Sequence, residues 1–194
     1  MFISIYAIAV FIFGLIIGSF LNVVIYRYNT GLSIKSGRSK CFSCGRWLTV
    51  KDLVPVFSFL WYRGKCRTCK ARISWQYPFV ELLTAFLFLA IYMHTVSISG
   101  EVSMSPIFLA IDLIITSIFI CIAVYDFKHK IIPDGLVYTT AGLALLKVLL
   151  FFMYGQGYVV ESGIWSAVIA GPIMAAPFAL LWLVSGGRWM GLGD

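Results

Sequence analysis

The fold of this protein is decided by residues 2–26, which read FISIYAIAVFIFGLIIGSFLNVVIY and contain no charged side chain. An α-helix rises about 1.5 Å per residue, so about 20 apolar residues cross the hydrocarbon core of a bilayer, which is about 30 Å thick. This stretch is too long for the apolar core of a secretory signal peptide, and no basic segment precedes it. It predicts a retained transmembrane helix.

Four further apolar stretches are long enough to span a membrane. The composition agrees, because 61% of the 194 residues are hydrophobic and only 12% are charged, whereas ordinary soluble domains have about 25% charged residues. Helices are expected because an open sheet cannot satisfy its backbone hydrogen bonds in lipid. The sequence therefore predicts an all-α polytopic membrane protein, a helical bundle with spans at residues 2–26, 78–96, 106–125, 135–154 and 162–184.

Positive charge is concentrated between the first two spans. Residues 27–77 contain eleven Lys and Arg and one acid, Asp52, so this segment carries +10, and the rest of the chain carries −3 of the net charge of +7. By the positive-inside rule, this loop and residues 126–134 and 185–194 lie in the cytoplasm, and the N-terminus lies outside. Because this rule explains the charge, we expect the lipid bilayer as a partner and no nucleic acid.

Four of the five cysteines in the chain form two Cys-x-x-Cys pairs, Cys41 with Cys44 and Cys66 with Cys69. Two such pairs supply four thiolates, which can close a tetrahedral Zn²⁺ site. Two disulfides are an alternative, but stable disulfides are rare in the cytoplasm. A catalytic zinc is a second alternative, although four cysteines leave no open coordination position. We predict a structural zinc site that staples this small insertion.

Two aspartates are expected at the cytoplasmic membrane surface. Asp126 follows the third predicted span, and Asp194 ends the sequence GLGD at residues 191–194. A helix C-terminus disfavours an anion, so Asp126 is in an unusual place for a structural acid. Two neighbouring carboxylates can share a proton, one acting as base on a water and the other as acid toward a peptide. A solvated acid at a helix end is the alternative.

Five motifs in order resemble the bacterial type IV prepilin peptidases, a family of GxGD-type intramembrane aspartyl proteases. The resemblance covers nearly all of the chain, and its matching parts are residues 18–27 (GSFLNVVIYR), the two Cys-x-x-Cys pairs, residues 77–83 (YPFVELL), residues 126–134 (DFKHKIIPD) and residues 191–194 (GLGD). One such motif is weak by itself, whereas five in the family's order are specific.

The resemblance implies an enzyme that removes the short basic leader from type IV prepilins or secretion-system pseudopilins at the cytoplasmic face of the bacterial inner membrane. It implies that Asp126 and Asp194 are the catalytic pair. It also implies a second activity, N-methylation of the new N-terminus with S-adenosylmethionine, for which no binding residue is assigned. The cysteines that it assigns to zinc are Cys41, Cys44, Cys66 and Cys69.

The resemblance also suggests how the chain is organised. We expect a first span at residues 1–26, a cytoplasmic zinc-binding loop at 27–77 and a membrane-embedded peptidase domain at 78–194. Family members usually continue into further spans, so the natural chain is expected to extend beyond Asp194. Two other functions stay open: a non-enzymatic membrane scaffold whose zinc loop docks a partner, and a transporter with Asp112 in a proton path.

The sequence also predicts the surroundings of three residues within the spans. Asn22 is expected to hydrogen-bond within the helical bundle. Cys121, alone in the third span, is expected to be a small buried apolar residue. Glu81 lies near the start of the second span, where an acid is favourable; pairing with a basic group of a substrate leader is the alternative.

Overall fold

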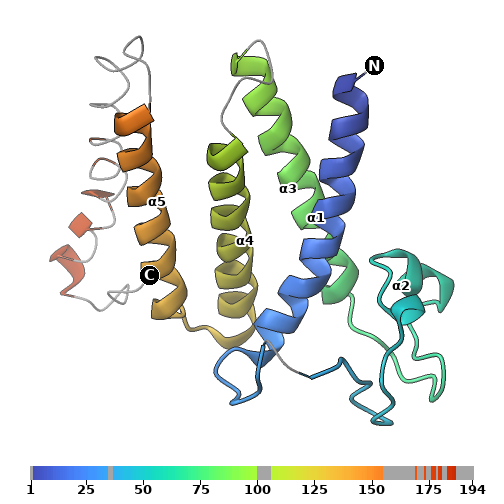
Figure 1. The fold of residues 1–194 in the computed structure, drawn as a ribbon. Helices are drawn as coiled ribbons and strands as arrows, with labels where there is room; N and C mark the ends of the chain where they lie inside the picture. Colours follow the sequence, from blue (N-terminus) through green and yellow to red (C-terminus); the bar gives the residue numbers. More distant parts are fainter. Residues whose placement is uncertain are drawn as a thin grey trace. The chain divides into compact units, whose positions relative to one another are not determined.

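The computed structural model describes residues 2–34, 37–99, 106–154, 169, 173, 176, 177, 179, 180 and 183–186. The named elements in this part of the chain are all helices (Figure 1). They are α1 (Phe2–Arg27), the short 3-10 helix η1 (Val50–Asp52), α2 (Phe57–Trp61), α3 (Gln76–Ser99), α4 (Pro106–His129) and α5 (Asp134–Tyr154). The chain forms two compact units, residues 1–136 and 137–194.

Four helices of the described residues are long and apolar enough to cross a membrane, namely α1, α3, α4 and α5. They correspond to the first four predicted spans and extend them by one to four residues at several ends. The prediction of an all-α polytopic membrane protein with an insertion between the first two spans is therefore confirmed. The fifth predicted span, residues 162–184, lies mostly outside the described residues.

Helices α1 and α3 pack closely in the first unit because two glycines of α1 let the backbones approach (Figure 1). A Cβ atom on Gly14 would lie 2.6 Å from the Cα of Ala85, and one on Gly18 would lie 2.6 Å from the Cα of Glu81. Both distances are too short for any other residue. The two glycines form a G-x-x-x-G pattern, a known signal for helix pairing in membranes, which the sequence analysis overlooked.

A small apolar core joins α1, α3 and α4. Its buried members come from the half of each helix nearest the loop, and Cys121 of α4 is among them with 4% of its surface exposed. The expectation that Cys121 is a buried apolar residue is therefore confirmed. The remaining buried members of this cluster are Leu21, Ile25, Val80 and Ile120.

A buried amide ties α1 to the start of α3. The side-chain nitrogen of Asn22 donates hydrogen bonds to the carbonyl oxygens of Gly18 and Tyr77, each at 3.2 Å. Asn22 is 2% exposed, so without these partners its amide would be desolvated at a high cost. The expectation that Asn22 hydrogen-bonds within the bundle is confirmed.

Candidate metal centre and candidate catalytic residues

The first Cys-x-x-Cys pair lies in a tight turn of the loop between α1 and α3. The Cys41 N–H donates to the Arg46 carbonyl at 2.9 Å, and the Gly45 N–H donates to the Cys41 carbonyl at 2.9 Å. An antiparallel bridge between Lys40 and Trp47 closes the turn at its base. Gly45 has a φ of +71°, a conformation that glycine adopts without steric cost. We call this turn the first knuckle.

The second Cys-x-x-Cys pair forms a second knuckle of the same design. The Cys66 N–H donates to the Ala71 carbonyl at 2.8 Å, and the Lys70 N–H donates to the Cys66 carbonyl at 3.1 Å. Lys70 takes the place that Gly45 has in the first knuckle and adopts a similar φ of +59°. This conformation is unfavourable for a residue with a side chain, so the surrounding turn must hold it.

The two knuckles bring four sulfur atoms together. All four Sγ atoms lie within 4.8 Å of one another, and the Sγ atoms of Cys41 and Cys69 are 3.8 Å apart. In an ideal tetrahedron with Zn–S bonds of about 2.3 Å, neighbouring sulfurs are about 3.8 Å apart. The donor set and the spacing therefore fit a tetrahedral metal ion, and the cluster, which consists of Cys41, Cys44, Cys66 and Cys69, can hold one.

The surroundings of the second knuckle favour a thiolate at one of its cysteines and not at the other. The N–H groups of Cys69 and Thr68 point at the sulfur of Cys66 and lower the pKa of this thiol to about 6. At Cys69, the Ala71 N–H also favours the thiolate, but burial and the neighbouring sulfurs outweigh it and raise its pKa to about 11. Four thiolates so close together require a bound cation to offset their charge.

An ion pair fixes the segment that follows the first knuckle. The Nη2 atom of Arg46 lies 2.8 Å from one carboxylate oxygen of Asp52. The other carboxylate oxygen of Asp52 accepts hydrogen bonds from the Thr49 N–H at 2.9 Å and from the Thr49 hydroxyl at 2.8 Å. Burial alone would raise the pKa of Asp52, but these partners together lower it below its ordinary value. The only acid of the basic loop is therefore structural.

The loop has a small apolar centre next to the second knuckle. Phe59 of α2 is 7% exposed, and its ring lies 4.8 Å from the ring of Trp75, measured between centroids. A Cβ atom on Gly64 would lie 3.0 Å from the Phe59 ring, so glycine at this position lets the chain pass closely over it. Only Phe59 and Cys66 are buried apolar residues among the described residues of this loop, which explains its need for a staple.

Side chains of both membrane helices that the loop joins contact it. The carboxylate of Glu81, buried at the sixth residue of α3, accepts a hydrogen bond of 2.7 Å from the Val56 N–H, just before α2. The ring of Tyr26 at the end of α1 lies 4.5 Å from the ring of Phe42 in the first knuckle. The expectation for Glu81 was incomplete, because its side chain bonds the loop, and no local pattern in the sequence indicates this partner.

Asp126 lies in the last turn of α4, where the sequence predicts it, and is half-buried. The helix ends just beyond it, as the Lys130 N–H donates to the Asp126 carbonyl at 2.7 Å. Beside it the ring of Tyr125 stacks on His129 at 4.4 Å and meets the ring of Tyr28 edge-on at 5.5 Å. Asp126 is thus at the end of the bundle that carries the loop.

Asp194 and its neighbours Gly191 and Gly193 lie outside the described residues. The pairing of Asp126 with Asp194 therefore stays a prediction from the sequence. What the structure describes of the candidate site is one aspartate at a helix end and the four-cysteine cluster in the loop.

Comparisons with known proteins identify the family. The N-terminal domain of the bacterial peptidase family A24 matches residues 12–95. Several similar proteins bear the name prepilin leader peptidase/N-methyltransferase. That of Bacillus subtilis is 41% identical over 127 residues, which are 66% of this chain and 48% of that protein. That of Aeromonas hydrophila is 32% identical, and the alignment covers 95% of this chain and 68% of that protein. That of Dickeya chrysanthemi is 30% identical, and the alignment covers 98% of this chain and 71% of that protein.

No solved structure matches the chain, and the chain spans about half the length of its relatives from Bacillus subtilis and Pectobacterium carotovorum. The longer alignments nevertheless run through almost the whole chain and include the four-cysteine loop and the helices on either side of it. This chain belongs to the prepilin leader peptidase/N-methyltransferase family.

Proposed function

We propose that this chain is part of a membrane aspartyl endopeptidase that removes the basic leader from type IV prepilins or pseudopilins. The observation that carries the proposal is the family membership, since the relatives that align with almost the whole chain are named for this activity. The reaction would take place at the cytoplasmic face of the inner membrane, where the positive-inside rule puts the loop and the end of α4.

The proposed catalytic pair is Asp126 and Asp194. Support comes from the position of Asp126 in the last turn of α4, where it is half-buried and follows Tyr125, whose ring meets that of Tyr28. A carboxylate there can accept a proton from water, and a second carboxylate nearby would hold the proton that is donated to the leaving amine. The role of Asp194 rests on the GLGD motif alone.

The proposed role of the four cysteines is to bind a structural Zn²⁺ that staples the loop. The fit of their sulfur atoms to a tetrahedron supports this role, and four cysteine ligands would leave no open position for a substrate. Bound zinc would supply folding free energy, and the chain's own contribution is the pair of knuckles that present the sulfurs. S-adenosylmethionine is proposed as the methyl donor of a second activity because the relatives are named N-methyltransferases.

A leader-cleavage assay with the natural full-length protein tests the catalytic pair. In membranes with a prepilin substrate, Asp126→Asn and Asp194→Asn are each expected to lower the cleavage rate by on the order of 10²–10⁴-fold. Asp134→Asn, an acid in the first turn of α5, is the matched control and should cleave at nearly the normal rate. Normal cleavage by either of the first two variants removes that residue from the mechanism.

The same assay separates the proposal from the scaffold alternative. A scaffold whose zinc loop docks a partner would lose binding when the cysteines are replaced and would be unaffected by either aspartate change. A transporter with Asp112 in its proton path would show no prepilin cleavage at all, and Asp112→Asn would abolish its flux.

A further inference from the structure

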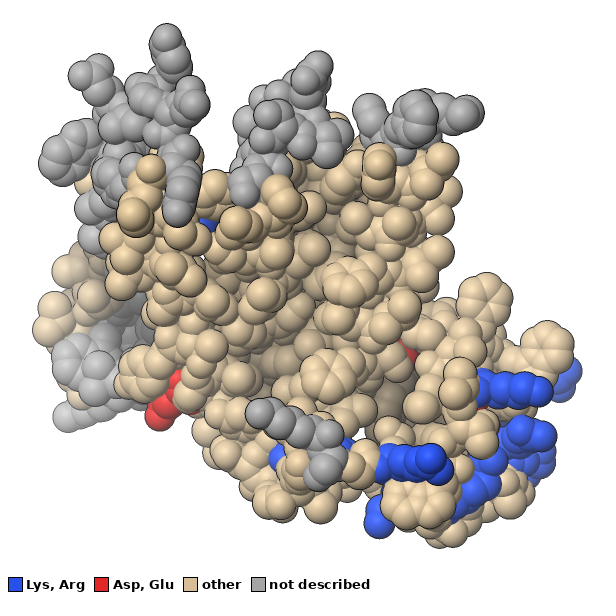
Figure 2. All heavy atoms as spheres, viewed as in Figure 1, with Lys and Arg blue, Asp and Glu red and all other residues tan. Residues whose placement is uncertain are grey.

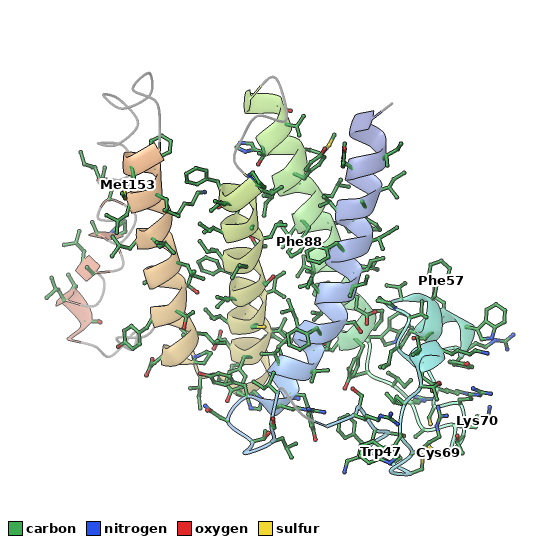
Figure 3. The ribbon with its side chains drawn as sticks, viewed as in Figure 1. Trp47, Phe57, Cys69, Lys70, Phe88 and Met153 are labelled. Atoms are coloured by element: carbon green, nitrogen blue, oxygen red, sulfur yellow. The ribbon has the colours of Figure 1, made fainter. Side chains whose placement is uncertain are left out.

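Helix α2 presents an apolar face that the loop does not cover. Of its five residues, Phe59 points into the loop's centre, whereas Phe57, Leu60 and Trp61 are 71%, 63% and 82% exposed. In Figure 3, Phe57 projects from the side of the loop nearest the membrane-spanning parts of α1 and α3, and Trp47 and Cys69 lie on the opposite side. Three large apolar side chains in so short a helix call for an apolar partner.

The depth of α2 is set by its bond to the membrane helices. Glu81, whose carboxylate accepts the Val56 N–H, lies five residues after Gln76, the start of α3. Its Cα faces Gly18, nine residues before Arg27, the end of α1. At about 1.5 Å per residue, the Cα of Glu81 lies about 8 Å inside one helix end and about 13 Å inside the other. In a spanning helix whose ends reach the outer edge of the headgroups, a residue at this position lies near the boundary between headgroups and hydrocarbon.

The turn at Val56, just before α2, has a protein partner for its N–H group. Val56 has a φ of +60°, which is a strained conformation for a β-branched residue, and the Phe57 N–H bonds the Pro55 carbonyl across it in a tight three-residue turn. Irregular backbone at membrane depth is tolerated only when its polar groups have protein partners. The buried Glu81 supplies the partner for the Val56 N–H, and this explains why an acid is buried there.

Basic side chains lie directly beside the aromatic face. A hollow with a volume of about 260 Å³ opens next to Trp61 and contains four cationic residues. Figure 2 shows Lys and Arg gathered over the loop, whereas the surface of the helices is almost free of them in this view. The lining residues are Trp61, Tyr62, Arg63, Lys65, Cys66, Arg67 and Lys70.

We propose that α2 is an interfacial membrane anchor, with Phe57, Leu60 and Trp61 inserted among phospholipid chains on the loop's side of the membrane. The neighbouring basic hollow receives the anionic headgroups of the same leaflet. Lipid is the occupant that the geometry favours, because the bond to Glu81 places α2 at bilayer depth and α3 exposes Phe79 at the same end. Aromatic side chains beside basic ones are typical of membrane interfaces. The proposal does not depend on the proposed enzymatic activity.

Fluorescence quenching by brominated lipid tests this anchor. The full chain is placed in nanodiscs in two forms, one keeping only Trp61 and the other only Trp47, with the other tryptophans changed to Phe. Trp47 is the matched control, because it is exposed in the same loop but lies on its far side (Figure 3). We expect phospholipid brominated near the headgroup to quench Trp61 at least twofold more than Trp47, and aqueous iodide to quench them in the opposite order.

Equal quenching of the two tryptophans by bromolipid, or stronger quenching of Trp61 by iodide, overturns the proposal.

Two further variants test the hydrogen bond between Glu81 and Val56, which sets the depth of α2. In the Trp61-only protein, Glu81→Ala should lower quenching by bromolipid, whereas Glu81→Gln, which keeps an acceptor for Val56, should retain it. Brominated phosphatidylglycerol should quench Trp61 more than brominated phosphatidylcholine at low salt, and equal quenching would exclude the basic hollow as a headgroup site.

Discussion

The pair of helices α1 and α3 and the loop that joins them are held together in opposite ways. The helices meet through glycines that let the backbones touch, with one buried amide between them. The loop has hardly any buried apolar residues and depends on four sulfur atoms and one ion pair. In lipid, helix association relies on close packing because burial of apolar surface gives no gain there. A small segment with so few buried apolar residues has too little core and needs a staple.

The largest effect is expected from removing the proposed zinc ion. Structural zinc contributes about 10–16 kcal/mol of apparent binding free energy in small domains, so Cys66→Ser or a strong chelator should unfold the loop while the membrane helices persist. The measurements are zinc content and limited proteolysis, with new cleavage between residues 45 and 65. Cys121→Ser, which changes a cysteine in the core of the helices, is the control. The loop of this variant should keep the same zinc content as that of the wild type. Proteolytic cleavage in the membrane helices but not in the loop would contradict the expectation that only the loop depends on zinc.

An intermediate effect is expected from Gly18→Ala. The new Cβ would lie 2.6 Å from the Cα of Glu81, so α1 and α3 must move apart, at a cost of about 1–3 kcal/mol. Gly142→Ala in α5, whose Cβ would meet nothing within 4 Å of it in the described residues, is the control. Unfolding in mixed micelles with increasing denaturing detergent measures the difference. Equal stability of the two variants would show that close helix packing is not what holds α1 to α3.

The smallest effect is expected at the ion pair of the loop. Because the pKa of Asp52 is lowered in the folded loop, its contribution to stability is present above the ordinary value of about 3.9 and is lost as the pH falls through the lower folded value. At neutral pH, Asp52→Asn should speed amide hydrogen exchange at residues 49–53 by roughly two- to fivefold, as for an ion pair in a surface loop whose Arg46 side chain is partly exposed. The ratio of the exchange rates of the variant and the wild type should stay constant from pH 5 to 8. A ratio that falls to one within that range would mean that another titratable group causes the effect.

The main features of the fold could be predicted from local sequence. The apolar lengths predict the four described spans, because a bilayer requires about 20 apolar residues in each. The two Cys-x-x-Cys pairs predict a metal site because their spacing already suits two turns. The G-x-x-x-G pattern of Gly14 and Gly18 was also readable, since small residues four apart lie on one face of a helix.

Contacts between distant segments could not be predicted. The bond between Glu81 and Val56 joins residues 25 apart in the sequence, and neither a helix-start acid nor a valine in a loop indicates the other. The pairing of Arg46 with Asp52 joins residues only six apart, yet the sequence does not indicate it either, because each of the eleven cations of the basic loop was an equal candidate. Such partners depend on how the chain turns between them, and that is settled only when the whole loop is packed.

The sequence by itself determined which described segments are long and apolar enough to cross a membrane and which cysteines can meet, since these follow from apolar length and short spacings. Only the tertiary structure decided that α1 and α3 touch through Gly14 and Gly18 and that α2 is held at the depth of Glu81. The physical reason is that solvation acts on each segment separately, whereas close packing and buried hydrogen bonds exist only between segments that the fold has brought together.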